Sequence, residues 1–167
     1  ANWWVDRMYL QDAFAAARHS TDPNTQVGAV LVLPVGGVVL AGWNAVPERV
    51  RDYKYTLETK NYCTEHAERA VIFKALHNGL PTQGLTLYCT WGACAECSRT
   101  IIEFGIKRVV TLRRLVEAST ARWEDTIHNG LLMMKCSGIN TVGWSGDLGT
   151  KYNIQFNGRV VGNEDLL

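Results

Sequence analysis

Apolar residues recur every three or four positions over residues 3–18, which predicts a helix because this spacing places them on one helical face. An alanine cluster in the same stretch adds high helix propensity. Three more helices are predicted over residues 64–77, 94–104 and 123–136. Thr64 is expected to cap the second helix. A glycine follows each later helix near its predicted end: Gly79, Gly105 and Gly138.

Five shorter apolar runs have the length of strands. Residues 27–33 and 38–43 are separated by a break that contains proline and glycine, which predicts a β-hairpin. The other strands are predicted over residues 85–90, 107–112 and 139–144. Because these three alternate with helices through short joins, we expect them to pair in parallel with right-handed crossovers.

The predicted fold is an α/β, three-layer α-β-α sandwich, in which a five-stranded mixed sheet has an antiparallel hairpin at one edge and helices on both faces. A length of 167 residues fits a single domain over residues 1–167, with its core at about residues 3–144. The Gly- and Asn-rich tail, residues 145–167, is left without an assigned structure.

The segment over residues 48–61 is too long for a simple connection, and such segments usually carry function or move. A solvated loop face is one interpretation of its charges, and contact with an anion is the other. The cations in question are Arg49, Arg51, Lys54 and Lys60.

Composition narrows the class of protein. Hydrophobic residues make up 47% of the chain, which supports a continuous core, and the net charge of +1 argues against a polyanion-binding protein. A small nucleotide would need only a few local cations. No apolar run reaches about 18 residues, so no membrane span is expected. Residues 1–6 lack the basic and apolar segments of a secretory signal, which favours a cytoplasmic location.

Cysteine usage points to a metal. Two of the five cysteines, Cys94 and Cys97, form a Cys-x-x-Cys pair, which without an export signal indicates reduced thiols rather than disulfides. Three positions apart, they share one face of a predicted helix start. With His66 they make the one-histidine, two-cysteine set that holds zinc with its fourth position open. The positive ends of the two predicted helices favour the thiolate that zinc requires.

Glu68 lies two positions after His66, so it points away from the ligand face and is free to transfer protons. Zinc can lower the pKa of a bound water from roughly 16 to 7, and the resulting hydroxide attacks an amidine-like carbon such as C4 of cytosine. We therefore interpret the site as that of a zinc-dependent deaminase. The competing interpretation is a closed structural zinc site with Cys89 as fourth ligand, which leaves Glu68 without a role.

These motifs resemble the cytidine deaminase superfamily, whose signature is His-x-Glu followed by Pro-Cys-x-x-Cys. Within it, the sequence is most similar to the deoxycytidylate (dCMP) deaminase family, over roughly residues 8–144. The matching stretches are residues 20–29, 42–47, 66–68 and 94–97. The sequence departs from the family at Ala93, where the signature has proline, at Ala45, where glycine is usual, and at Arg69-Ala70, where many members have asparagine second.

The resemblance implies that His66, Cys94 and Cys97 bind Zn2+ and that Glu68 is the proton shuttle. It further implies three substrate contacts. Asn44 and its loop would touch the sugar and phosphate of the nucleotide, the backbone N–H of Ala67 would reach the pyrimidine carbonyl, and Ser20 would contribute to the phosphate site.

The activity that the resemblance implies is hydrolytic deamination of dCMP to dUMP and ammonia, which supplies the precursor of dTMP. Family members form oligomers, typically hexamers. They are commonly activated by dCTP and inhibited by dTTP, with Mg2+ accompanying the triphosphate at a separate site. The location would be the cytoplasm, or the host cytoplasm if the source is a virus.

Four basic residues are candidate effector or phosphate contacts. Lys74 and His77 lie toward the far end of the metal-binding helix, where exposed polar residues that complement the helix dipole are an equal alternative. Arg113 and Arg114 follow the fourth predicted strand, at the edge where such sheets bind ligands. A solvated basic pair is the alternative there.

Two other functions share the zinc motif. One is a deaminase that acts on bases in tRNA or single-stranded DNA, which the near-neutral charge and the Asn44 loop disfavour. The other is a catalytically silent, zinc-stabilised interaction module.

Overall fold

A central five-stranded sheet organises the computed structural model, which describes residues 2–167; Ala1, the first residue of the predicted domain, lies outside the described residues. The strands are β1 (Gly28–Val32), β2 (Val38–Trp43), β3 (Thr86–Cys89), β4 (Arg108–Leu112) and β5 (Asn140–Trp144), in the spatial order β2-β1-β3-β4-β5. β1 pairs antiparallel with β2 and β3, whereas β3, β4 and β5 are parallel. The predicted mixed sheet is confirmed.

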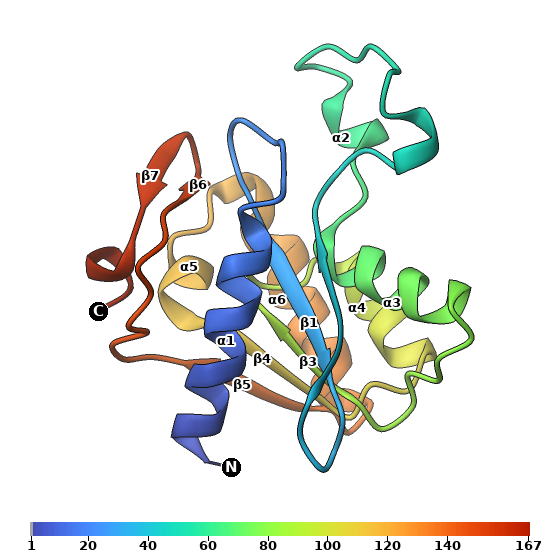
Figure 1. The fold of residues 1–167 in the computed structure, drawn as a ribbon, viewed down its shortest axis with the longest axis vertical. Coiled ribbons are helices and arrows are strands. Elements are labelled where there is room, and N and C mark those ends of the chain that lie inside the picture. Colours follow the sequence, from blue (N-terminus) through green and yellow to red (C-terminus); the bar gives the residue numbers. More distant parts are fainter. Residues whose placement is uncertain (1) are drawn as a thin grey trace.

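Helices cover both faces of this sheet (Figure 1). α1 (Trp3–Ala17) lies on one face, and α3 (Ala67–His77), α4 (Ala95–Glu103) and α6 (Ala121–Cys136) lie on the other. Among residues 2–167, none of these helices combines the length and the apolarity needed to cross a bilayer.

Two glycines show why the layers pack so closely. Gly28 on β1 faces α1, where a Cβ would collide with the backbone of Ala13 and Ala17. Gly42 on β2 faces α3, where a Cβ would lie 2.9 Å from the Cβ of Val71. Gly42 pairs with Ala29, the neighbour of Gly28, so the two glycines point to opposite faces. Any side chain at either position would push a helix off the sheet.

The helix that carries the metal motif begins later than predicted. α3 starts at Ala67, with His66 as its N-cap, so Thr64 is not the cap. The hydroxyl of Thr64 instead donates to the carbonyl of Lys60 at 2.9 Å. Glu65 forms an isolated bridge with Ala45, and these bonds hold residues 64–66 extended. The prediction was wrong here because this long-range pairing outweighs the local capping preference.

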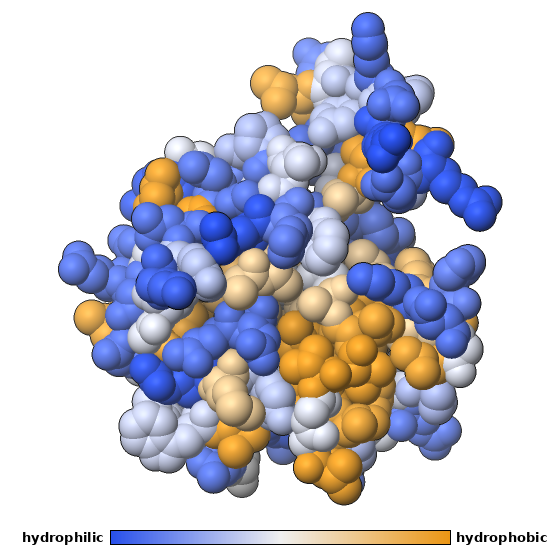
Figure 2. Space-filling view, in the orientation of Figure 1, coloured by the Kyte–Doolittle hydropathy of each residue, from blue (hydrophilic) through white to orange (hydrophobic). Residues whose placement is uncertain are grey.

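Two short helices lie within the long connection after β2. They are η1 (Glu48–Val50) and α2 (Lys60–Cys63). The segment projects from the body of the molecule, and its surface is mostly hydrophilic (Figures 1 and 2). By contrast, Figure 2 shows apolar side chains gathered over the β1–β2 hairpin, which exposes Leu33, Val35 and Val38.

The tail that had no assignment is structured. β6 (Ile154–Phe156) and β7 (Arg159–Val161) form a hairpin, followed by η2 (Asn163–Leu166). Both turn residues, Asn157 and Gly158, have the positive φ that a type I′ turn requires. Apolar side chains of the tail join the main hydrophobic cluster: Leu148, Ile154, Phe156, Val161 and Leu166. A further short helix, α5 (Arg113–Glu117), follows β4 directly and was not predicted.

A buried ion pair ties α1 to β4. The guanidinium of Arg108 donates to both carboxylate oxygens of Asp6 at 2.7 Å, and the Tyr88 hydroxyl donates to the same carboxylate at 2.8 Å. Burial alone would raise the pKa of Asp6, but the bonds from Arg108 and Tyr88 outweigh it and hold the pKa below its ordinary value of 3.8. The ionised carboxylate therefore stabilises the fold.

We expect Asp6→Asn to lower the free energy of unfolding by about 3 kcal/mol at neutral pH, because it leaves the Arg108 charge unpaired. The folded-state pKa of Asp6 lies below the unfolded value. Its contribution is therefore complete above pH 3.8 and is lost as the pH falls from there through the folded-state pKa. Urea unfolding of the wild type and of Asp6→Asn at several pH values measures the free energy of unfolding of each protein. The difference between the two values isolates Asp6, because the other titrating groups contribute equally to both proteins.

Glu48→Gln is the matched control, because the Glu48–Arg51 pair is exposed and worth at most about 1 kcal/mol. A difference between wild type and Asp6→Asn that stays constant from about pH 7 to about pH 3 would contradict this role of Asp6.

Candidate active site

Three metal-binding side chains meet at the N-termini of α3 and α4. His66 is the N-cap of α3, Cys94 is the N-cap of α4, and Cys97 lies in the first turn of α4. The His66 Nδ1 atom lies 3.5 Å from the Cys94 Sγ and 3.4 Å from the Cys97 Sγ. All three donor atoms lie within 4.8 Å of one another. The predicted donors are therefore brought together by the fold.

Neighbouring elements fix this convergence. Arg69 on α3 forms ion pairs with Glu65 and with Glu96 of α4, so it links the starts of the two helices. Thr126 of α6 accepts the backbone N–H of Ala95 at 2.9 Å. Gly130 lets α6 approach the connection between β3 and α4, because a Cβ at Gly130 would lie 2.8 Å from the carbonyl oxygen of Ala93.

The electrostatics suit an anionic ligand set. Hydrogen bonding with Cys97, and then with His66, lowers the pKa of the Cys94 thiol to about 4 despite its burial. The Cys97 N–H also donates to the Cys94 Sγ at 3.4 Å, as a helix N-terminus does toward a negative group. Cys94 is thus prepared as a thiolate donor.

The donor set fits zinc with an open position. Among the described residues, no other histidine, cysteine, aspartate or glutamate joins the three-donor cluster. Cys89 is fully buried outside it, and burial raises the pKa of its thiol well above the ordinary value. The geometry therefore does not favour the closed site in which Cys89 is a fourth ligand. A zinc ion would be held by one nitrogen and two sulfur atoms, as in catalytic sites that leave one position for water or substrate.

Glu68 lies in the first turn of α3 and is only 4% exposed. Burial raises the pKa of its carboxyl to about 7, against the opposing effect of nearby His66. A carboxyl that titrates near neutrality can both accept and donate a proton at the working pH. Glu68 therefore has the properties of a general acid–base group.

A cavity of about 240 Å3 opens over the donors. Its floor includes His66, Ala67 and Glu68 at the start of α3. Its walls come from residues 22–27, the end of β2, the projecting segment, the β3–α4 loop and the start of α6. Five wall segments, several of them distant in sequence, thus enclose the site.

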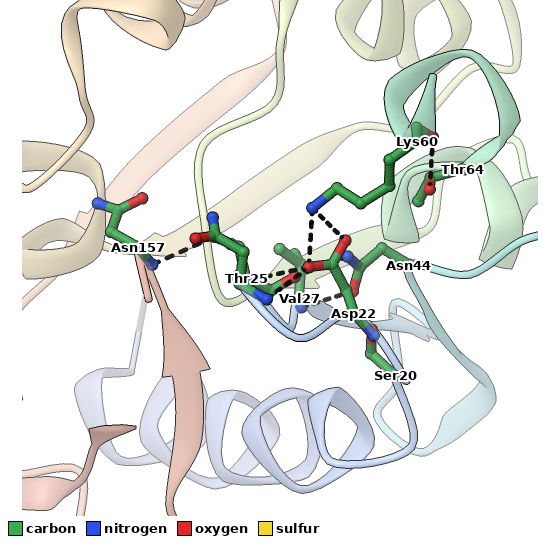
Figure 3. Close-up of polar contacts among 9 residues, drawn as sticks. Ser20, Asp22, Thr25, Val27, Asn44, Lys60, Thr64 and Asn157 are labelled. Carbon is green, nitrogen blue, oxygen red and sulfur yellow. Dashed lines mark hydrogen bonds and ion pairs between the residues drawn. The ribbon is translucent and has the colours of Figure 1, made fainter. Parts of the chain in front are cut away.

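One wall is a polar network centred on Asp22 (Figure 3). The Asp22 carboxylate accepts the backbone N–H groups of Asn24 and Thr25 at 2.8 and 2.9 Å. It also pairs with the Lys60 ammonium at 2.9 Å, and the two side chains are only 7% and 13% exposed. Lys60 is therefore the one cation predicted in the 48–61 segment that lines the cavity; Arg49, Arg51 and Lys54 do not.

Asn44 lines the same wall, and its amide is held by the backbone. Its Oδ1 accepts the N–H of Val27 at 2.7 Å, and its Nδ2 donates to the carbonyl of Thr25 at 2.8 Å. Asn44 therefore fixes the loop before β1, and only its remaining N–H is free to meet a ligand.

The opposite wall is aromatic and basic. Trp123 lies edge-on to the His66 ring, with ring centroids 5.7 Å apart. Trp91 packs edge-on against Trp123, with ring centroids 5.6 Å apart. Trp123 therefore both lines the cavity and packs against Trp91. When the Asn61 side-chain amide is oriented with its oxygen toward Arg122, this oxygen accepts two N–H groups of the Arg122 guanidinium, at 2.7 and 3.1 Å.

The remaining candidates lie away from the cavity. The buried Ser20 Oγ accepts the Asp22 N–H at 3.2 Å and is not part of the lining. Lys74 donates to the Ala41 carbonyl on another face of the molecule, and His77 lies in the last turn of α3. Arg113 pairs with Glu117, and Arg114 donates to the Leu167 carbonyl at 2.6 Å. Neither arginine lines the cavity; Arg113 instead lies beside Gly143 of β5 in a separate hollow.

Arg122 and Trp91 are lining residues that sequence reasoning missed. The fourth helix was predicted to begin at Trp123, but it begins at Ala121 after Thr120, so Arg122 lies in its first turn. The Thr120 N-cap was the available signal. No local pattern marks Trp91, which enters the wall through the β3–α4 loop.

Comparison with known proteins agrees with this geometry. The family model described as "Cytidine and deoxycytidylate deaminase zinc-binding region" matches residues 4–113. The chain belongs to the cytidine and deoxycytidylate deaminase family. This membership covers the three metal donors and Glu68, and it ends before the α6 wall of the cavity.

Several relatives of this deaminase family member are known. Deoxycytidylate deaminase of Pongo abelii is 34% identical over 110 residues, which cover 61% of each chain. A protein of Aliivibrio fischeri named "Uncharacterized deaminase in luxG 3'region" is 32% identical over 138 residues, covering 81% of this chain and 90% of that relative. The chain spans about 60% of the length of the animal deoxycytidylate deaminases it matches, at 58% for Drosophila melanogaster and 61% for Homo sapiens.

Solved structures share the fold of this family member. The dCMP deaminase of cyanophage S-TIM5 in its apo form has a TM-score of 0.67 at 21% identity, covering 86% of this chain and 99% of that chain. Its complex with dCMP and dUMP has a TM-score of 0.65 at 23% identity, covering 84% and 97%.

We expect Cys94→Ala and Cys97→Ala each to reduce the zinc content from about one ion per chain to below about 0.1, because two donors hold zinc too weakly. Atomic absorption on purified, dialysed protein measures this content.

Cys89→Ala is the matched control, since it removes a buried thiol outside the three-donor cluster and should leave the zinc content unchanged. Zinc loss in Cys89→Ala equal to that in Cys94→Ala would contradict a three-donor site.

Proposed function

We propose that this protein is a zinc-dependent hydrolase that deaminates dCMP to dUMP and ammonia. The observation that supports this proposal most strongly is the position of Glu68, a buried carboxyl with a pKa of about 7, at the floor of a cavity beside a three-donor cluster. A structural zinc site has no use for such a group. The names of the animal and phage relatives support dCMP as the substrate.

Glu68 carries the proton transfers. When bound, zinc supplies a Lewis acid that lowers the pKa of water and stabilises developing negative charge. Glu68 accepts the proton of the attacking water and delivers it to the ring nitrogen N3. It then assists departure of the exocyclic amine as ammonia, so one carboxyl serves as base and acid in turn. Its pKa near 7 keeps both protonation states accessible.

The cavity floor and walls orient the base. Ala67 lines the cavity at the start of α3, and its N–H has no acceptor among the described residues, so we assign this N–H to the pyrimidine 2-carbonyl. Trp123 and Trp91 provide an apolar surface for the ring. These contacts hold C4 of the base toward the metal donors and Glu68.

Lys60 and Arg122 are the cations of the cavity lining, and we assign them to the substrate phosphate. Asp22 holds Lys60 in place, and Asn61 holds Arg122, so both cations are positioned before the ligand arrives. Asn44 would meet the sugar through its free N–H. The role expected for Ser20 is reduced to holding the Asp22 turn.

The biological setting is also a proposal. Deamination of dCMP would supply the precursor of dTMP, in the cytoplasm or in the host cytoplasm if the source is a virus. A homo-oligomer, typically a hexamer in this family, fits the exposed apolar side chains over the β1–β2 hairpin.

Ammonia release from dCMP by the zinc-loaded protein tests this function directly. We expect turnover of dCMP to exceed that of deoxycytidine, because Lys60 and Arg122 gain no partner from a nucleoside. Turnover confined to RNA or single-stranded DNA oligomers would instead identify a nucleic-acid deaminase. Absence of turnover on every cytosine nucleotide would identify a silent zinc module.

Glu68→Ala separates chemistry from folding. We expect this variant to retain zinc and the fold but to lose at least about 100-fold in kcat, the lower scale of general acid–base catalysis. Zinc content and circular dichroism provide the control measurements. A variant with near wild-type kcat would remove Glu68 from the mechanism.

We extend the proposal to regulation by dCTP as activator and by dTTP as inhibitor, with Mg2+ bound to the triphosphate. Lys74 lines a separate surface hollow with Trp43 and Phe73, and none of the zinc donors lines this hollow. We expect dCTP to shift the dCMP saturation curve to lower concentrations and dTTP to shift it to higher ones. Saturation curves that neither triphosphate changes would refute regulation.

A further inference from the structure

The C-terminal hairpin contacts the cavity wall although none of its residues lines the cavity. The N–H of Gln26 donates to the Gln155 carbonyl at 2.8 Å, and the N–H of Gln155 donates to the Gln26 Oε1 at 2.7 Å. The N–H of Gly158 donates to the Asn24 carbonyl at 2.9 Å. These three bonds, together with one from Asn157, connect β6–β7 to residues 24–26, the loop that forms the polar wall.

Asn157, at the tip of the hairpin, bridges two walls. Its backbone N–H donates to the Thr25 Oγ1 at 3.2 Å (Figure 3), and Thr25 lines the cavity. Its Nδ2 donates to the carbonyl of Ala118 at 2.9 Å, in the connection that precedes α6. One residue thus joins the loop before β1 to the opposite side of the site.

The hairpin also supports the aromatic wall. Phe156 is buried and packs edge-on against Trp91, with ring centroids 5.2 Å apart. The Trp91 Nε1 donates to the Ser119 Oγ at 2.9 Å, next to the Ala118 carbonyl that Asn157 holds. Phe156 and Asn157 therefore act on the same wall through adjacent contacts.

We propose that the β6–β7 hairpin is a positioning element of the cavity and that Asn157 is a positioning residue, which sets residues 24–26 relative to the Trp91 wall. The choice of dCMP as the ligand in its test rests on the proposed function. Residues 24–26 belong to no helix or strand, so their placement depends on Asp22, Asn44 and this hairpin.

The identity of residue 157 fits this role. Its φ of 51° lies in the left-handed region, which asparagine tolerates better than most residues and which glycine adopts freely. Asn157→Gly therefore keeps the turn and the N–H to Thr25, and it removes only the bond to Ala118. An alanine would add backbone strain and would confuse the two effects.

We expect Asn157→Gly to raise KM for dCMP about three- to tenfold and to leave kcat within about twofold, because a lost wall contact weakens ground-state and transition-state binding alike. We also expect amide hydrogen exchange of residues 24–27 to accelerate about threefold or more, while exchange in β3 stays unchanged. A residue that served only global stability would not produce this pattern.

Asn163→Ala is the matched control. It removes an amide from the same tail, whose partners are Asp147 and Thr150 outside the cavity lining, so KM and exchange at residues 24–27 should remain at wild-type values. Equal rises of KM in both variants, or unchanged exchange at residues 24–27 in Asn157→Gly, would overturn the positioning role. If the wild type releases no ammonia from dCMP, the proposed function fails, and the exchange comparison alone then decides the positioning role.

Discussion

The convergence of two helix N-termini on one point is the constraint on which the rest of the structure depends. His66 and Cys94 are extended N-cap residues, so their side chains lie beside the positive ends of α3 and α4 rather than along the helices. Arg69 and the close approach of α6 at Gly130 keep the two helix starts together. A shift of either helix would separate donors that now lie within 4.8 Å.

The same arrangement sets the chemistry of the carboxyl. Glu68 is the second residue of α3, so the helix start that brings His66 to the donor cluster also places Glu68 at the cavity floor. Burial then raises its pKa to about 7. One helix start therefore supplies a metal donor, a buried carboxyl whose pKa lies near neutrality and a backbone N–H at the cavity floor. Because one helix start supplies all three groups, their motif spans only residues 66–68.

The metal donors and one side of the cavity wall come from different parts of the chain. The region matched by the family contains all three donors and Glu68, whereas Arg122, Trp123 and the hairpin that supports Trp91 lie beyond it. The walls can therefore differ between family members without altering the metal site. The two residues that depart from the family pattern at positions 45 and 69 are both held by local contacts. Ala45 forms a β-bridge with Glu65, and Arg69 forms ion pairs with Glu65 and Glu96.

The sequence by itself determined the elements with strong periodicity, the mixed sheet, the three donors and the place of Glu68 beside the donors rather than among them, because these follow from spacing along one segment. It carried an unused signal for the tail, since Asn157-Gly158 between apolar runs is typical of a hairpin. Only the tertiary structure decided that Thr64 is no cap, that Arg113 and Arg114 lie outside the cavity lining, that Arg122 and Trp91 line the cavity, and that the tail contacts its walls. Those outcomes depend on contacts between residues far apart in the chain, whose free energies exceed the local preferences that a sequence pattern reports.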